Sequence, residues 1–114
     1  MIFDARERED YERALPEAFE AAQAAAREGE PIVFLLTQGD LLGQRGAPRA
    51  ILANALLSGM RTLAAEGHRA NAVATGPDAD PGDVEHWIAL LQDGRGVAGE
   101  LVRVGAVHVG KVQP

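Results

Sequence analysis

Residues 37–65 read TQGDLLGQRGAPRAILANALLSGMRTLAA, which is the end of a strand, a glycine-rich loop and the longest apolar helix that the sequence predicts. The preceding residues, PIVFLLT at 31–37, are apolar almost without interruption, as is typical of a parallel strand that is buried on both faces. Pro48 suits the first turn of the helix, which we expect to run to about Glu66. This unit decides the fold, because similar strands and helices are added to it on either side.

On the N-terminal side, the spacing of apolar residues predicts one helix. Residues 1–4 suit a short edge strand, and a charged segment follows them. Because proline is tolerated only in a first turn, Pro16 places the start of the regular helix near Leu15, and we expect its end after Glu28. The helix has one apolar face, whose members recur every three or four residues: Tyr11, Leu15, Phe19, Ala22 and Ala26.

On the C-terminal side, two further strands flank a third helix. Residues 69–75 (RANAVAT) and 101–109 (LVRVGAVHV) read as strands. The helix between them begins after Asp80, a favourable N-cap, and its apolar stripe includes Trp87, which we expect in the core. The alternation predicts an α/β fold, a Rossmann-like half of two or three layers with about four parallel strands in β-α-β-α-β-α-β order. We expect residues 1–114 to form one domain.

The composition narrows the classes of function. Seventeen acidic and 11 basic residues give a net charge of −6, which argues against non-specific binding to nucleic acid. The chain has no cysteine, so disulfides and thiolate nucleophiles are excluded. Its longest aliphatic or aromatic run, IVFLL, is far shorter than the roughly 20 residues of a membrane helix, and its charged start does not suit a secretory signal. We expect a cytoplasmic protein without nucleic-acid or membrane partners.

Polar clusters have simpler explanations than ligand binding. Acidic residues and a histidine gather at residues 78–86, but they lack the pattern of a calcium loop, so capping and solubility explain them. His68 and His108 are isolated in the sequence, and we expect no metal site. Arg45 and Arg49 could bind an anion near the start of the long helix, although a solvated loop explains them more simply.

Several segments resemble the C-terminal half of short-chain dehydrogenases/reductases (SDRs). ALLSGMRTLAAE at 55–66 is similar to the family helix A-x-x-G-L/M-x-R-x-L-A-x-E, and RANAVATG at 69–76 to the strand R-V-N-x-V-x-P-G. FEAAQAAAREGEPIVFLLT at 19–37 resembles the helix and strand before the catalytic loop, and GELVRVGAVHVG at 99–110 the last strand. The resemblance covers about residues 10–109. It implies a truncated, degenerate C-terminal half without the cofactor-binding half.

The resemblance also implies where an active site would lie. The family uses a serine, a tyrosine about thirteen residues later and a lysine four further on, and the lysine lowers the pKa of the tyrosine that exchanges the proton. The serine position falls on Thr37, and the other two fall on Ala50 and Asn54, or one residue earlier on Arg49 and Ala53. The chain's one tyrosine and one lysine stand near opposite ends of the sequence. We expect no catalytic residues, and no cofactor unless a partner chain supplies NAD(P).

The leading interpretation is therefore a non-catalytic pseudo-enzyme that acts as an assembly or interaction subunit. Right-handed connections between neighbouring strands would place all helices on one face of the sheet, and another copy would be the simplest cover for the other face. We expect an obligate homo-oligomer, a dimer or tetramer, or pairing with a catalytic SDR. Gly59 in the middle of the long helix lowers helix stability by about 1 kcal/mol relative to alanine, and a close helix crossing would offset this cost. The expected interface residues are Leu52, Leu56, Gly59, Met60 and Leu63.

Two alternatives stand beside this interpretation. The chain could be an NAD(P)-dependent enzyme of related activity, or a ligand binder, with a pocket shared between subunits of an oligomer. Thr37, Gln38 and Asn54 are then the candidate ligand-binding residues, because Thr37 and Gln38 follow the carboxyl end of a strand, where open α/β sheets bind ligands. The chain could also be a remnant without an independent role.

Overall fold

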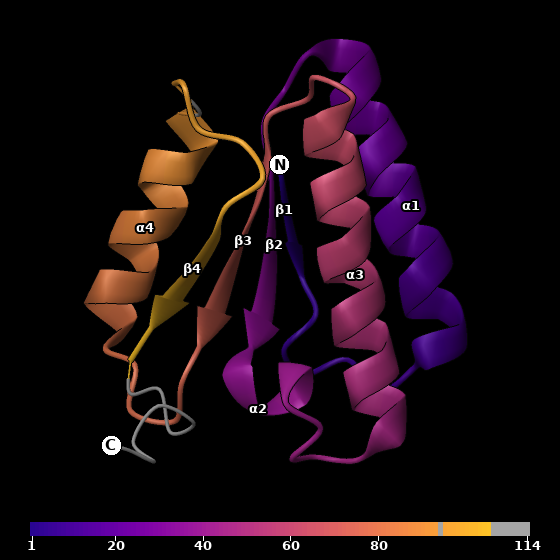
Figure 1. The fold of residues 1–114 in the computed structure, drawn as a ribbon, viewed down its shortest axis with the longest axis vertical. Helices are drawn as coiled ribbons and strands as arrows, with labels where there is room; N and C mark the ends of the chain where they lie inside the picture. The colour runs from indigo at the N-terminus through magenta and orange to yellow at the C-terminus, as the bar shows by residue number, and fades with distance from the viewer. Residues whose placement is uncertain (94, 106–114) are drawn as a thin grey trace.

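In the computed structural model, which describes residues 1–93 and 95–105, strands and helices alternate along the chain (Figure 1). All strand pairs are parallel, and their order across the sheet is β1-β2-β3-β4. The predicted α/β fold with about four parallel strands is confirmed, and the short helix α2 is an unpredicted addition. The elements are β1 (Ile2–Asp4), α1 (Tyr11–Glu28), β2 (Ile32–Thr37), α2 (Gln38–Leu41), α3 (Ala47–Ala65), β3 (Ala70–Thr75), α4 (Pro81–Asp93) and β4 (Leu101–Val104).

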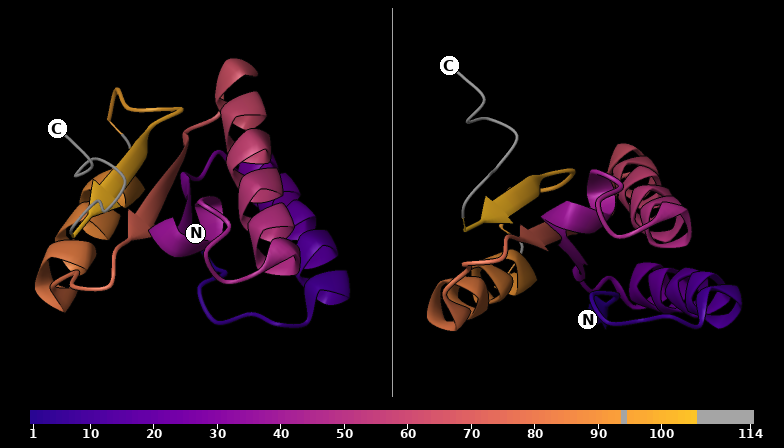
Figure 2. Two further views of the ribbon diagram at one scale, coloured as in Figure 1. Left: turned by 60° about the horizontal axis from the view of Figure 1, so that its bottom comes forward. Right: turned by 90° about the horizontal axis from the view of Figure 1, so that it is seen from below.

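The sheet lies between two helical layers, with α1 and α3 on one face and α4 on the other (Figure 2). Side chains of β2 alternate between the layers: Phe34 and Leu36 pack towards α1 and α3, whereas Val33 and Leu35 pack towards α4. All four are at most 3% exposed. The expectation that every helix lies on one face is therefore wrong, because α4 covers the face for which another copy is the expected cover.

The position of α4 gives its crossover an unusual hand. The strands follow one another across the sheet in sequence order, so a helix on the opposite face implies a connection of the opposite hand. The β1-α1-β2 and β2-α3-β3 connections are right-handed, and the β3-α4-β4 connection is left-handed (Figure 2). Because only about 2% of parallel crossovers are left-handed, this connection is a specific feature of the topology.

The buried face of α1 is built from alanines. Its buried residues are Ala14, Ala18, Ala22 and Ala25. These small side chains let the helix pack closely on the sheet, and they displace the predicted apolar face by about one residue. Leu15 and Phe19 are consequently 39% and 64% exposed. Leu15 and Phe19 therefore point away from the core, contrary to the prediction, whereas Tyr11 at the start of the helix is partly buried against it.

Helix α1 also begins earlier than predicted, at Tyr11 rather than near Leu15. The backbone oxygen of Asp10 accepts hydrogen bonds from two N–H groups of the first turn, at 2.9 Å each. Ala14 is fully buried and holds this turn against the core. Pro16 therefore lies inside the helix, where tertiary packing outweighs its intrinsic cost.

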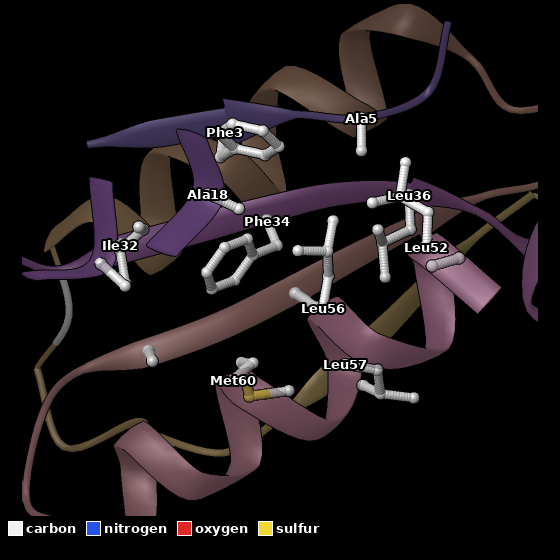
Figure 3. Close-up of a cluster of buried hydrophobic side chains, with 14 of the residues drawn as sticks. Phe3, Ala5, Ala18, Ile32, Phe34, Leu36, Leu52, Leu56, Leu57 and Met60 are labelled. Carbon is white, nitrogen blue, oxygen red and sulfur yellow. The ribbon is translucent and has the colours of Figure 1, made fainter. Parts of the chain in front are cut away.

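The larger core lies between the sheet and the helices α1 and α3 (Figure 3). Leu52, Leu56 and Met60 project from α3 into the cluster that contains Phe34 and Leu36 of β2. Their exposed fractions are 3%, 5% and 0%, in that order. The apolar face of α3 is thus used within this chain. Within the described ranges, no helix is both long enough and apolar enough to cross a membrane.

The last two elements differ from the prediction in detail. Trp87 is 39% exposed on α4, while Val84 and Leu91 of the same helix face the sheet. The prediction that Trp87 belongs to the core is therefore wrong. Strand β4 is four residues long, and residues 106–109 of the predicted strand lie outside the described residues, as does the tail that follows them.

A buried asparagine that the sequence pattern did not single out fixes the loop before β4. Asn71 of β3 is 0% exposed. Its side-chain nitrogen donates to the backbone oxygen of Val97 (3.1 Å), and its side-chain oxygen accepts from the backbone N–H of Glu100 (3.0 Å). Both polar ends of the amide are paired, as burial requires.

Candidate functional site

The position aligned with the family's serine lies where β2 ends and α2 begins. The Thr37 hydroxyl oxygen accepts a hydrogen bond from the backbone N–H of Asp40 (3.1 Å), so Thr37 is the N-cap of α2. A single helical turn depends on such a cap rather than on helix propensity, which is why the sequence pattern did not predict α2. The hydroxyl group thus stabilises a helix end.

The other two candidate ligand-binding residues are held by different elements. Gln38 is 5% exposed, and its amide nitrogen donates to backbone oxygens at the ends of β3 and β4, at 3.4 Å each. Asn54 is exposed, and its amide nitrogen donates to a backbone oxygen of α2 (3.2 Å) and to one of its own helix (2.9 Å). Each of the three residues therefore makes a separate structural contact, and these contacts do not gather them around one pocket.

The positions aligned with the family's tyrosine and lysine carry neither a phenol nor an ammonium group. Ala53 is buried at 3% exposure, and Ala50 is half-buried. Arg49 extends towards the segment after β1, where its guanidinium donates to the Glu9 carboxylate (3.0 Å). In both alignments the positions therefore lack the phenol and ammonium groups that the family's proton transfer requires.

A buried carboxylate, Asp40, stands at this end of the sheet and is paired with Arg45. Asp40 is 4% exposed, and its two carboxylate oxygens accept hydrogen bonds from the Arg45 guanidinium at 2.8 Å and 2.9 Å. The same guanidinium donates to the backbone oxygen of Arg6 (2.9 Å), which ties α2 to the segment after β1. Burial raises the pKa of Asp40, but hydrogen bonds from Arg45 and Thr37 outweigh burial, so the pKa lies below its ordinary value.

Four arginines around the ends of β1 and β2 are each paired with a carboxylate. The bond from Arg8 lowers the pKa of Asp10 to about 2. The anion site considered for Arg45 and Arg49 is not favoured, because carboxylates of this chain already neutralise both guanidinium groups. The pairs are Arg6–Asp4, Arg8–Asp10, Arg45–Asp40 and Arg49–Glu9.

Replacing Asp40 by asparagine should lower the free energy of unfolding at pH 7 by about 2 kcal/mol, because the charged hydrogen bonds to Arg45 are lost. The depressed pKa adds stability that is fully present above the unfolded-state pKa near 4 and is lost as pH falls through the folded-state pKa. Between pH 7 and pH 3, the free energy of unfolding measured in urea should therefore fall by less for Asp40→Asn than for wild type.

The matched control for Asp40 is Asp93→Asn. Asp93 pairs with Arg95, and both side chains are more than half exposed. Exposed pairs contribute little, so this variant should stay within about 0.5 kcal/mol of wild type at both pH values. If Asp40→Asn and Asp93→Asn lowered the free energy of unfolding by the same amount, a structural role for the Asp40–Arg45 pair would be contradicted.

The candidate metal ligands do not assemble in the described part of the chain. Residues 1–93 and 95–105 contain no group of three or more histidine or carboxylate side chains that could hold a metal ion. His86 stands edge-on to the Trp87 ring, with ring centroids 5.8 Å apart. His68 borders a groove described next, and His108 lies outside the described residues.

A groove of about 550 Å³ lies between α1 and α3 and reaches Phe34 of the sheet. Its lining combines small residues of both helices, among them Ala22, Ala55 and Gly59, with larger apolar side chains, among them Leu63 and the exposed Phe19. A Cβ atom added at Gly59 would have no neighbour within 4 Å. Among residues 1–93 and 95–105, no close helix crossing therefore offsets the cost of this glycine to the helix.

The predicted interface residues divide between this groove and the core. Gly59 and Leu63 line the groove, and Leu56 reaches it from the core. Leu52 and Met60 are buried within the chain itself and are not available to a partner. The interface prediction is therefore corrected at these two positions, because the apolar face of α3 that contains them packs on the sheet.

The exposure of Leu15 and Phe19 on the outer side of α1 was not predicted, although the sequence of α1 contains a signal for it. Alanines at positions 14, 18, 22 and 25 form a second stripe beside that of Leu15 and Phe19. The stripe of small residues is the one that allows a helix to pack closely, which leaves the large side chains outside. Ile51 of α3 is exposed at 66% for a similar reason, since Leu52 takes the buried place.

No protein-family model matches this sequence, and a search of curated proteins found no match.

Proposed function

We propose that this chain is a non-catalytic, SDR-like pseudo-enzyme that functions as a subunit of a homo-oligomer. The observation that carries the proposal is the outer face of α1 and α3. Leu15, Phe19 and Ile51 are 39%, 64% and 66% exposed on these helices. Ile51 shares a face of α3 with Ala55, four residues later, which lines the groove. Apolar side chains gathered around a groove are typical of an association site.

The proposal that the chain is non-catalytic is supported by the polar side chains at the end of the sheet, which make hydrogen bonds and ion pairs within the chain. The Thr37 hydroxyl caps α2, and the Gln38 and Asn54 amides bond to backbone oxygens. Asp40 and Arg45 neutralise each other. These contacts stabilise the loops at the end of the sheet, and they leave no acid–base pair in the arrangement that the SDR reaction needs.

The proposal that the chain forms an oligomer is supported by the exposed faces of α1 and α3, and not by an uncovered face of the sheet. Because α4 covers the second face of β2 and β3, the sheet supplies no reason for a second copy. The exposed side chains of α1 and α3 supply one, since burial of a large apolar side chain is worth about 1.5–3 kcal/mol. A catalytic SDR is the alternative partner for the same face, and it would be the source of any bound NAD(P).

Calorimetric titration with NADH and NADPH tests the absence of catalysis. We expect no binding at micromolar concentrations, because the chain lacks a glycine-rich cofactor motif and its polar residues are engaged. Sedimentation equilibrium on the same sample should give a mass that is a multiple of the 12.0 kDa chain. Micromolar cofactor binding by this protein alone would contradict the pseudo-enzyme, and a 12.0 kDa species at all concentrations would contradict the oligomer.

A further inference from the structure

We infer that a second groove, between α4 and β4, binds a small organic ammonium ion that carries an apolar group, with the indole ring of Trp87 and the carboxylate of Glu100 as its partners. This groove lies on the side of the sheet that α4 covers, away from α1 and α3 (Figure 2). The inference therefore goes beyond the proposed function and does not depend on it.

The groove has the size and the walls of a small-molecule site. Its volume is about 530 Å³, within the range of about 300–1,000 Å³ that is usual for ligand pockets. Trp87 and Leu90 of α4 line it together with Val102 of β4 and Val97 of the loop before β4. Trp87 and Leu90 are 39% and 48% exposed, so an apolar group bound here would remove apolar surface from water.

The aromatic side chain of this groove favours a cation. Indole is the side chain whose ring face attracts a cation most strongly, and the attraction grows when the two groups are shielded from water. The apolar side chains of Leu90, Val97 and Val102 line the same groove and provide such shielding. An ammonium ion with an apolar group therefore uses both the ring of Trp87 and the apolar walls.

The charged residues of the groove also favour a cation. Two carboxylates, Asp93 and Glu100, and one guanidinium, Arg95, line it, so one negative charge remains. Asp93 and Arg95 pair with each other, at 3.3 Å between Oδ2 and Nε. In the part of the chain that the structure describes, the carboxylate of Glu100 makes no ion pair and no hydrogen bond. Glu100 is therefore free to act as the counter-ion of a bound ammonium group.

The wall of the groove is fixed by the buried amide of Asn71. This amide bonds to the backbone of Val97 (3.1 Å) and of Glu100 (3.0 Å), and both of these residues line the groove. The backbone N–H of Gly99 ties the same loop to the oxygen of Ala70 (2.8 Å). A wall that is ordered before binding reduces the entropy that a ligand must overcome. The polar residue in the middle of β3 thus keeps the groove in shape.

The fluorescence of Trp87 reports binding directly, because this residue is the only tryptophan of the chain. The probe is benzyltrimethylammonium, and the comparison ligands are phenylacetate, of opposite charge, and benzyl alcohol, which is uncharged. We expect a saturable change in emission with the cation, and a dissociation constant at least about tenfold higher for each comparison ligand. Equal affinity for benzyl alcohol, or no saturable binding of the cation, would overturn the inference.

Titration calorimetry extends the test to variants that lack the tryptophan. Trp87→Leu should weaken binding of benzyltrimethylammonium about tenfold, and Trp87→Phe by less, because phenylalanine keeps a ring face and leucine keeps only apolar contact. Glu100→Gln should weaken it about threefold, as is typical of an exposed ion pair. The control Glu66→Gln removes an exposed carboxylate from the α1/α3 groove and should change nothing. Equal affinity of wild type and Trp87→Leu would contradict the site.

A second chain is the competing occupant of this groove. If a second chain covered it, the Trp87 emission should shift to shorter wavelength as the protein is concentrated without ligand, because the indole would leave water. That shift would overturn the inference, since the groove would be closed to a small molecule. An emission that does not depend on protein concentration supports an open groove. The proposed oligomer is measured separately, by the mass at sedimentation equilibrium, so an oligomer that binds no cation would overturn this site alone.

Discussion

Replacing Leu91 by aspartate should unfold the chain, whereas the same replacement of its neighbour Leu90 should leave it folded. Leu91 is 3% exposed and packs with Val33 and Val73 beneath α4, while Leu90 is 48% exposed. A buried, unpaired carboxylate costs about 4 kcal/mol or more, which is comparable to the whole stability of a small domain. Far-UV circular dichroism and urea unfolding measure both variants.

This pair of variants tests the three-layer architecture directly. Both substitutions create the same charge on the same helix, so only the direction of the side chain differs. If α4 covers the sheet, Leu91→Asp loses the fold and Leu90→Asp changes stability by less than about 1 kcal/mol. Similar behaviour of the two variants would mean that α4 does not lie on β2 and β3.

Replacing Met60 by alanine should lower the free energy of unfolding by about 3 kcal/mol. Met60 is 0% exposed in the larger core, and truncation of such a side chain removes its burial and leaves a cavity. The control is Ile51→Ala on the same helix, where 66% exposure in the single chain predicts a loss below about 0.5 kcal/mol in the monomer. Urea unfolding in the Phe19→Glu background, which we expect to be monomeric, separates folding from association.

The comparison between Met60 and Ile51 shows which side of α3 is buried against the sheet. A larger loss for Ile51→Ala than for Met60→Ala in this monomeric background would contradict the direction in which α3 faces the sheet. In the wild-type background, Ile51→Ala should weaken association, because it removes apolar surface from the proposed interface.

The class of fold was predictable because its signals are local. The continuous apolar run IVFLL indicates a strand buried on both faces, and the structure gives its residues 32–36 exposed fractions of at most 3%. Gly29 and Gly67 follow α1 and α3, and Pro48 and Pro81 stand in the first turns of α3 and α4, although Pro16 lies inside α1. The alternation of strands and helices implies parallel pairing. These features do not depend on distant contacts.

The direction in which each helix faces was not predictable from spacing alone. On α1, large and small apolar residues form two neighbouring stripes, and close packing selects the alanines. On α4, the usual hand of a crossover predicts the wrong face of the sheet. The fit between elements also decides which side of each helix is buried, and the predicted burial of Phe19 and Trp87 was therefore wrong.

The contacts of the candidate site could not be predicted from the sequence, and the expected absence of a catalytic set stays a prediction. That prediction rests on the identities at Thr37, Ala50 and Asn54, which are not the serine, tyrosine and lysine of the family. The Asp40–Arg45 pair and the capping role of Thr37 depend on α2, a single turn with no periodic signal. The assignment to a non-catalytic relative of the SDRs stays a proposal drawn from the residue pattern.

The most direct test of the central claim is the thermal unfolding midpoint of the unmodified chain over about a hundredfold range of protein concentration. Unfolding of a dimer into two separate chains depends on concentration by mass action, so the midpoint should rise as the protein is concentrated. The Phe19→Glu variant should show no such dependence. A midpoint of the wild-type chain that is the same at every concentration would contradict assembly through α1 and α3.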